Sequence, residues 1–218
     1  MRSPDKRRAC ADARSDSGLR MFGLPFFRRN PPALKGERVT LRMPVSSDYR
    51  EWAQLRSESR AFLEPWEPSW APDELEKSAW RYRLRRYRED FARGTAIAYF
   101  IFDTKSGKLL GGVTLGNIRH GVAKSGHIGY WIGERYAGKG FMVDALDLLA
   151  RHAFETMRLH RIEAACIPGN KRSIRVLEKA GFTREGLLRS YLKINGGWQD
   201  HYLYALIVGD RRGARAKD

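Results

Sequence analysis

The residues best suited to chemistry lie between positions 130 and 142, where the sequence reads YWIGERYAGKGFM. This stretch passes from a β-like run into a helical pattern, so Gly138 and Gly140 stand where a strand ends and a helix begins. Glycine permits positive φ and close approach of a ligand, and the free N–H groups of a helix's first turn attract anions. Arg135 and Lys139 add positive charge. The stretch therefore predicts a phosphate-binding loop.

Two familiar phosphate loops do not fit these residues. A Walker loop requires G-x-x-x-x-G-K-[ST], but here Lys139 precedes Gly140 and Phe141, and no hydroxyl follows to hold Mg²⁺. A dinucleotide-binding loop requires G-x-G-x-x-G early in a strand–helix–strand unit, whereas this G-x-G is followed by Phe, Met and Val. The loop does match the pattern R-x-x-G-x-G/A, which starts at Arg135.

Further motifs follow in a consistent order. The run NKRSIRVLEKAGF, which starts at Asn170, fits N-x-x-[SA]-x-x-x-[LY]-x-x-x-GF. With the R-x-x-G-x-G/A loop, it resembles the GNAT family of N-acetyltransferases, which bind acetyl-coenzyme A (acetyl-CoA). The runs RAFLEPWEPSW and LLRSYLKINGGWQDHYLYALI resemble the branch named for ribosomal-protein-alanine N-acetyltransferases. The resemblance covers residues 35 to about 208.

The resemblance implies a site for acetyl-CoA between two strands. The strands at residues 127–133 and 161–167 would splay apart and hold the pantetheine arm, and backbone amides around Ile132 would polarise the thioester carbonyl. Asn170 would bond the arm, or else serve only as a helix N-cap. The coenzyme-binding residues that the resemblance implies are Ile132, Gly133, Arg135, Tyr136, Ala137, Gly138, Lys139, Gly140, Phe141 and Asn170.

The implied reaction is direct attack by an amine in a ternary complex. It requires an unprotonated amine, a stabilised oxyanion and a proton for the departing thiolate. Many relatives place a Tyr seven residues after the motif's Asn, but here that position is Leu177. The hydroxyl of Ser173 is the natural substitute as the acid; the alternative is a helix-start serine that satisfies backbone amides.

The base is less well defined by the sequence. Glu163 could act through water, although a solvated or salt-bridged strand carboxylate is an equal alternative, and Asp200 could hold an incoming ammonium. An α-amino group has a pKa of about 7.7–8.0, against about 10.4 for Lys. A weak base therefore suffices for an N-terminus, and the lack of an obvious strong base favours an N-terminal acceptor over Lys.

Aromatic residues are the candidates for acceptor binding. By resemblance, Trp66 and Trp198 lie near the acceptor groove, where flat amphipathic rings can grip a peptide terminus. The alternative is that these aromatics belong to the core or its rim, and His127 and His201 are expected to be packed or surface histidines. The acceptor-binding residues that we predict are Trp66, Tyr130, Tyr191, Trp198 and Asp200.

The elements that must position these residues alternate along the chain. Strand-like runs occupy residues 37–44, 96–103, 108–118, 126–133, 161–167, 187–194 and 201–207, and the last two turn at NGG, a hairpin signal. Helical patterns occupy residues 49–55, 73–93, 142–154 and 170–180. They predict a mixed α/β domain with a central, mostly antiparallel sheet of about seven strands, flanked by about four helices. The resemblance implies a GNAT-like fold, in which this sheet is splayed between the fourth and fifth strands.

Size and composition set the limits. The 218 residues fit one domain at 35–208, between a basic flexible tail at 1–34, in which Met21 is an alternative start, and a basic tail at 209–218. No apolar run approaches roughly 18 residues, so no membrane insertion is expected. Cys10 and Cys166 are too few for a disulfide framework or metal site. A cytoplasmic monomer or homodimer is expected.

The charge points to polyanions. The net charge is +16 and the pI is about 10.2, which favours RNA, ribosomes or a phosphorylated cofactor. The run RYRLRRYRED is a solvated helix face or a ribosome contact. The sequence thus predicts a protein N-terminal acetyltransferase, with two alternatives: an acetyltransferase for a small amine (an antibiotic, polyamine or amino acid), and a basic ribosome- or RNA-associated factor.

Overall fold

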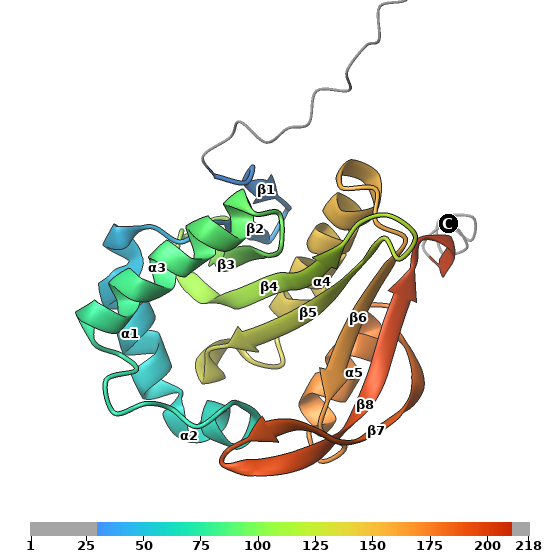
Figure 1. Ribbon diagram of the computed structural model, residues 1–218. Helices are drawn as coiled ribbons and strands as arrows, with labels where there is room; N and C mark the ends of the chain where they lie inside the picture. Colours follow the sequence, from blue (N-terminus) through green and yellow to red (C-terminus); the bar gives the residue numbers. More distant parts are fainter. Residues whose placement is uncertain (1–29, 211–218) are drawn as a thin grey trace, which may run out of the picture.

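A computed structural model describes residues 30–210 and contains one eight-stranded sheet with the strand order β1-β2-β3-β4-β5-β6-β8-β7 (Figure 1). The strands are β1 (Leu34–Lys35), β2 (Val39–Arg42), β3 (Ile97–Asp103), β4 (Leu109–Arg119), β5 (Ser125–Ile132), β6 (Arg161–Cys166), β7 (Thr183–Ile194) and β8 (Gly197–Ile207). The helices are α1 (Tyr49–Glu58), α2 (Arg60–Leu63), α3 (Lys77–Ala92), α4 (Phe141–Arg151) and α5 (Lys171–Lys179). The predicted mixed α/β class, with a mostly antiparallel sheet, is confirmed.

The sheet is buried on both faces where β3 crosses it. Tyr99 and Ile101 of β3 pack into the larger core, with α4 and α5. Phe100 and Phe102 point the other way and join a smaller core with Trp52 of α1 and helix α3. A strand covered on both sides reads as a continuous apolar run, which explains the sequence AIAYFIFD.

Helix α4 packs on the larger core through the stripe that its sequence predicts. Met142, Leu146 and Leu149 of α4, with Ala153 in the π-helical turn that continues it, recur at helical spacing, and none is more than 4% exposed. The chain then returns through β6, which lies parallel to β5. This strand–helix–strand unit fixes the end of β5 and the start of α4 next to each other, which is where the predicted phosphate loop lies.

The sheet opens between β5 and β6, as the sequence predicts for its fourth and fifth strands. The two strands pair only from Ser125 to Ile128 on β5 and from Arg161 to Ala164 on β6. Beyond these residues β5 continues to pair with β4 as far as Ile132, while β6 continues beside β8. Figure 1 shows the two strands diverging. The splay therefore leaves one side of the second half of β5 free of a strand partner.

The structure differs from the predicted elements at their margins. The eighth strand is the short edge strand β1, and α2 is a single short helix, both too brief to produce a periodic pattern. Helix α3 begins at Lys77 rather than near residue 73. The predicted NGG hairpin is confirmed, with Asn195 and Gly196 at φ +44° and +82°, the left-handed turn that suits twisted strands.

The described residues exclude 1–29 and 211–218, so most of the two predicted tails lies outside them. Met21 and Cys10 also lie outside the described residues. Within the described part, no helix combines the length and the apolar character needed to cross a bilayer.

Candidate active site

The predicted phosphate loop has the conformation that its glycines allow. Gly138 and Gly140 have φ of +76° and +85°, in the left-handed region. No atom lies within 4 Å of a Cβ built on Gly138, so its requirement is conformational rather than steric. Within residues 30–210, none of the N–H groups of residues 138–143 donates to a backbone carbonyl. These amides surround the N-terminus of α4, whose dipole adds positive potential, and so they suit a diphosphate.

The earlier part of the loop uses its amides internally. Gly133 N–H donates to the Leu110 carbonyl (2.9 Å), and the Tyr136 and Ala137 amides donate to carbonyls of the preceding turn (2.9 and 3.0 Å). A Cβ on Gly133 would lie 2.4 Å from a Leu55 methyl, so this glycine permits close packing against α1. The predicted coenzyme residues thus divide into a structural turn and a group with free amides.

The charges around the loop are partly committed to protein contacts. Arg135 donates to Glu58 of α1 at 2.9 Å, with its side chain half exposed, and its guanidinium lies 5.0 Å from the Tyr136 ring. The Lys139 ammonium lies 6.0 Å from the same ring. Lys139 therefore remains the more available cation beside the free amides.

Arg38, which the sequence analysis missed, holds the loop against the sheet. Its Nη2 donates to the Lys139 carbonyl at 2.6 Å, and its Nη1 lies 3.1 Å from Oδ2 of Asp144. Its guanidinium also lies 4.7 Å from the centre of the Phe141 ring. These groups are about a hundred positions away in the chain, so no local pattern could reveal the contact.

The predicted acid lies on the α5 side of the splay, beside a second hydroxyl. Ser173 Oγ and Tyr130 Oη are 2.7 Å apart, and Asn170 Oδ1 accepts the Ser173 N–H at 3.0 Å. Asn170 therefore does cap α5. Burial raises the pKa of the Tyr130 phenol, and the bond to Ser173 offsets this only in part. The two hydroxyls form a protonated pair where β5 leaves β6.

Glu163 has the contacts of an ion-paired strand carboxylate, one of the two alternatives considered from the sequence. Arg161 Nε donates to it at 2.7 Å, and Arg161 also binds Glu185 at 2.9 Å. The other carboxylate oxygen lies 3.9 Å from Nδ1 of His127, on the neighbouring β5. Burial lowers the pKa of His127, and Glu163 opposes that shift. The role of Glu163 as a base stays a prediction.

A cleft of about 340 Å³ lies between α1, α3 and the face of strands β3 to β5. Its floor includes Gly129, at the start of the splay, where an added Cβ would meet no atom within 4 Å. The cleft therefore reaches the point where a thioester in the splay would lie. Of the predicted acceptor residues, all within the described part of the chain, Tyr130 lines the cleft and the other four do not.

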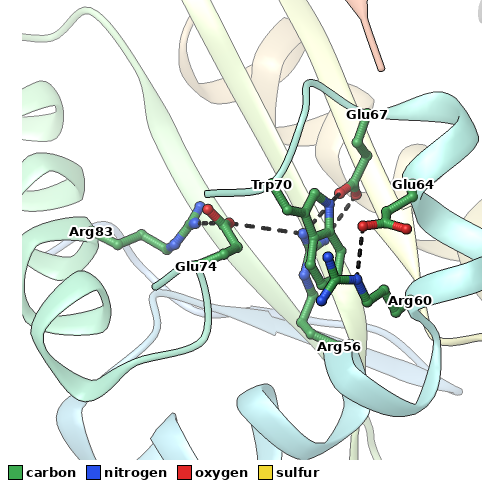
Figure 2. Close-up of polar contacts among 7 residues, drawn as sticks. All are labelled: Arg56, Arg60, Glu64, Glu67, Trp70, Glu74 and Arg83. Carbon is green, nitrogen blue, oxygen red and sulfur yellow. Dashed lines mark hydrogen bonds and ion pairs between the residues drawn. The ribbon is translucent and has the colours of Figure 1, made fainter. Parts of the chain in front are cut away.

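The outer wall of this cleft is a polar network centred on Arg56 (Figure 2). The Arg56 side chain is only 7% exposed and donates two hydrogen bonds of 2.8 Å to the Glu67 carboxylate. Trp70 Nε1 donates to the same carboxylate at 2.9 Å. Arg83 of α3 binds Glu74 beside them. The sequence analysis missed this network, because its members come from two helices and a loop.

The tip of the β7–β8 hairpin reaches this wall, as Figure 1 shows near α2. Asn195 N–H donates to the Glu67 carbonyl at 2.9 Å, and we call this contact the cleft bridge. Trp66 precedes the bridge and is 37% exposed, and Trp198 follows it and is 65% exposed. Both predicted aromatics therefore follow or precede the bridge closely in the chain, but neither lines the cleft.

The other two predicted acceptor residues hold the hairpin itself. Asp200 Oδ1 accepts the N–H of Ser190 at 2.8 Å, and Ser190 has a φ of +46° at an irregularity in β7. The Tyr191 ring packs edge-on against buried His201, with ring centres 5.7 Å apart. In this structure both side chains support the hairpin's shape.

Comparisons with known proteins agree with this geometry. The family model described as "Acetyltransferase (GNAT) domain" matches residues 38–183. Probable N-acetyltransferase YjcK of Bacillus subtilis (strain 168) is 37% identical, over 81% of this chain and 98% of its own. The [Ribosomal protein uS5]-alanine N-acetyltransferase of Escherichia coli (strain K12) is 35% identical, over 87% and 97%.

A solved structure shares the architecture. That of Mycobacterium smegmatis RimJ in complex with CoA-disulfide has a TM-score of 0.75 and 33% identity, covering 82% of this chain and 89% of that one. The region matched by the family model, residues 38–183, includes both the free amides ahead of α4 and the splay between β5 and β6. The chain belongs to the GNAT family of acetyltransferases.

Proposed function

We propose that this acetyltransferase moves acetyl from acetyl-CoA to the N-terminal α-amine of a protein, such as a ribosomal protein. The relative from Escherichia coli supports the acceptor class through its printed activity toward ribosomal protein uS5, and the RimJ complex supports a CoA compound as donor. The observation that carries the proposal is the cleft bridge between Asn195 and Glu67. We infer from this contact, which places the hairpin tip against the loop that lines the cleft, that a polypeptide enters by its end.

The residues present fit acetyl-CoA. The free amides of residues 138–143, with Lys139 beside them, would hold the diphosphate. The unpaired side of β5 beyond Ile128 would hold the pantetheine arm, because backbone groups there have no partner on β6. When bound, the coenzyme supplies an activated acetyl thioester. The chain's own contribution is to place that group beside Gly129 and the cleft.

The protein side of the chemistry follows from three features. The amine nitrogen of the acceptor reaches the carbonyl carbon through the cleft, a C–N bond forms and the C–S bond breaks. The Ser173–Tyr130 hydroxyl pair supplies a proton to the departing sulfur. An α-amine has a pKa of about 7.7–8.0, so a useful fraction is free base at neutral pH and gives its proton to water or a weak base.

Small polyamines are less well suited to this cleft. Its carboxylates, Glu67 and Glu74, are each bound to an arginine, Arg56 and Arg83 respectively. The pocket therefore offers no free negative charge from these two groups to attract a polycation. A peptide N-terminus carries only one amine, so its binding requires less negative charge in the cleft than binding of a polycation.

We further propose that the ribosome is reached through α3. The solvent face of this helix exposes basic side chains, and Tyr82 among them is 55% exposed. Those exposed basic residues are Lys77, Arg81, Arg85, Arg86 and Arg88. Phosphates attract such a face, and Arg83 and Tyr87 of the same helix line the acceptor cleft.

The test is coenzyme thiol release with matched short peptides. One has a free N-terminal Ala and no Lys; the second has the same sequence with a blocked N-terminus and an internal Lys; the third is blocked and lacks Lys. Release with the first peptide should far exceed release with the second, and the third should give none. Equal turnover of the second peptide, or faster turnover of spermidine or a free amino acid, would refute the proposed acceptor.

A further inference from the structure

Glu67 connects three parts of the acceptor cleft, and we propose that it determines acceptor specificity by holding the cleft bridge closed against internal lysines. This inference rests on the proposed function. The side chain of Glu67 is bound from inside by α1, and its backbone carbonyl is bound from outside by the β7–β8 hairpin. Glu67 therefore connects the wall of the cleft to the tip of the β7–β8 hairpin.

The inner attachment is strong because it is buried and bidentate. Arg56 presents two parallel N–H groups to the two oxygens of Glu67, each at 2.8 Å, and Trp70 adds a third donor at 2.9 Å. The Arg56 side chain is 7% exposed and that of Glu67 20%. Three N–H groups, two from Arg56 and one from Trp70, donate to the carboxylate, so only a side chain with two acceptor oxygens satisfies them.

The same network reaches the reacting end of the cleft. The Arg56 guanidinium lies 4.3 Å from the Trp70 ring and 5.0 Å from the Trp131 ring. Trp131 lies on β5 two residues after Gly129, in the part of the strand that has left β6. The position of Glu67 is thus tied through packed rings to the strand that borders the splay.

The outer attachment depends on the hairpin turn. Asn195 and Gly196 occupy left-handed positions in a two-residue turn, which leaves the Asn195 N–H directed out of the hairpin and toward Glu67. A Cβ built on Gly196 would lie 3.8 Å from Ser69 Oγ, so a side chain at this position would reach the loop that carries Glu67. Loss of the Glu67 position therefore removes the hydrogen bond that closes the groove.

The decisive variant is Glu67→Gln. Its single carbonyl oxygen accepts from one donor, while its amide N–H₂ faces the remaining N–H groups of Arg56 and Trp70, and this repulsion displaces the loop. The ratio of kcat/KM for the free N-terminal Ala peptide to that for the blocked Lys peptide should fall about tenfold, the scale of one charge-assisted hydrogen bond. The KM for acetyl-CoA should not change.

The matched control is Glu64→Gln, which removes the same charge three residues earlier. Glu64 pairs with Arg60 at the surface, with side chains 35% and 58% exposed, and both appear in Figure 2. It should leave the ratio unchanged. Trp70→Phe, which removes one donor to Glu67, should lower the ratio less than Glu67→Gln does.

An unchanged ratio in both Glu67→Gln and Trp70→Phe would overturn the inference, as would an equal fall in Glu64→Gln. If Glu67→Gln does not unfold cooperatively, Trp70→Phe alone decides. The proposed function stands or falls separately, on whether the parent chain acetylates the free N-terminus.

Discussion

Ser173 and Tyr130 are 43 positions apart in the chain, yet their hydroxyl oxygens lie 2.7 Å from each other in the splay. Burial raises the pKa of the Tyr130 phenol, so this hydroxyl keeps its proton throughout the neutral and mildly alkaline range. A pair that remains protonated can donate to a departing thiolate, and Tyr130 can restore the proton that Ser173 gives up.

Ser173→Ala should therefore lower kcat with little change in the KM for acetyl-CoA. The expected loss is about tenfold to a hundredfold, at or below the usual range for an acid, because a thiol of pKa about 8.5 leaves readily without full protonation. Steady-state thiol release at saturating coenzyme measures it. Ser78→Ala, on the exposed start of α3, is the control. An undiminished kcat would show that Ser173 only helps to begin the helix.

Gly138, Gly140, Asn170 and Ser173 could be proposed as site residues because each belongs to a short motif, and their roles stay predictions. Glu163 was predicted with an alternative, and its bond to Arg161 matches that alternative. The network of Arg56, Glu67 and Trp70 could not be predicted. Its contacts depend on how helix α1 and the following loop pack, and no periodicity encodes them.

At the scale of elements, the predicted phosphate loop is held by a residue about a hundred positions earlier in the chain. Arg38, just before β2, binds the Lys139 carbonyl at 2.6 Å and lies over Phe141. Arg38 thereby fixes the Lys139 carbonyl, which lies among the free amides of the loop. Without Arg38 those amides would sample more orientations before the coenzyme binds.

Arg38→Ala should raise the KM for acetyl-CoA about threefold to tenfold, the effect of one hydrogen bond, and leave kcat nearly unchanged. Lys35→Ala, an exposed cation on β1, removes the same charge without touching the loop and is the control. Coenzyme titrations at fixed peptide concentration distinguish the two variants. An equal rise in both would assign the effect to general electrostatics instead of loop positioning.

Most elements were predictable because their apolar residues recur at the strand or helix period. The stripe from Met142 to Ala153 and the alternation in β2 are examples, and both stripes are buried. β1 and α2 were missed because two and four residues cannot display a period. The predicted start of α3 near residue 73 was too early, since the helix begins at Lys77 and Glu74 in the segment before it binds Arg83.

At the scale of the whole molecule, two half-buried histidines link stability to pH. Burial lowers the pKa of both His127 and His152 below the ordinary 6.5. Around His127, the Glu163 carboxylate opposes this shift and His201 adds to it. As the pH falls through 6.5, the unfolded chain binds these protons first, so the folded state loses stability until the folded pKa values are passed.

The free energy of unfolding should therefore decrease between a pH above 6.5 and one well below it, and the decrease should be smaller when both histidines are replaced by Gln. Urea titrations of the parent and of His127→Gln/His152→Gln at the two pH values measure the difference. Carboxylates that contact neither histidine contribute equally in both chains and cancel. Identical pH dependence in the two chains would refute this assignment.

The two cores also determine where the site can lie. The larger core holds α4 and α5 against one face of the sheet, and the smaller core holds α1 and α3 against the other. β5 borders both and separates from β6 between them, so coenzyme and acceptor can approach the same strand from different elements. The resemblance predicted this splay, but the hydrogen bond from the hairpin tip to the Glu67 carbonyl emerged only in three dimensions.

The central claim is that the junction between β5 and α4 binds the diphosphate of acetyl-CoA. The most direct measurement is calorimetric titration of acetyl-CoA into the parent chain and into Gly138→Asp/Gly140→Asp, which places carboxylates among the free amides at left-handed positions. Saturable binding by the parent and none by the folded double variant are expected. Absence of binding by the parent, or equal affinity in both chains, would contradict it.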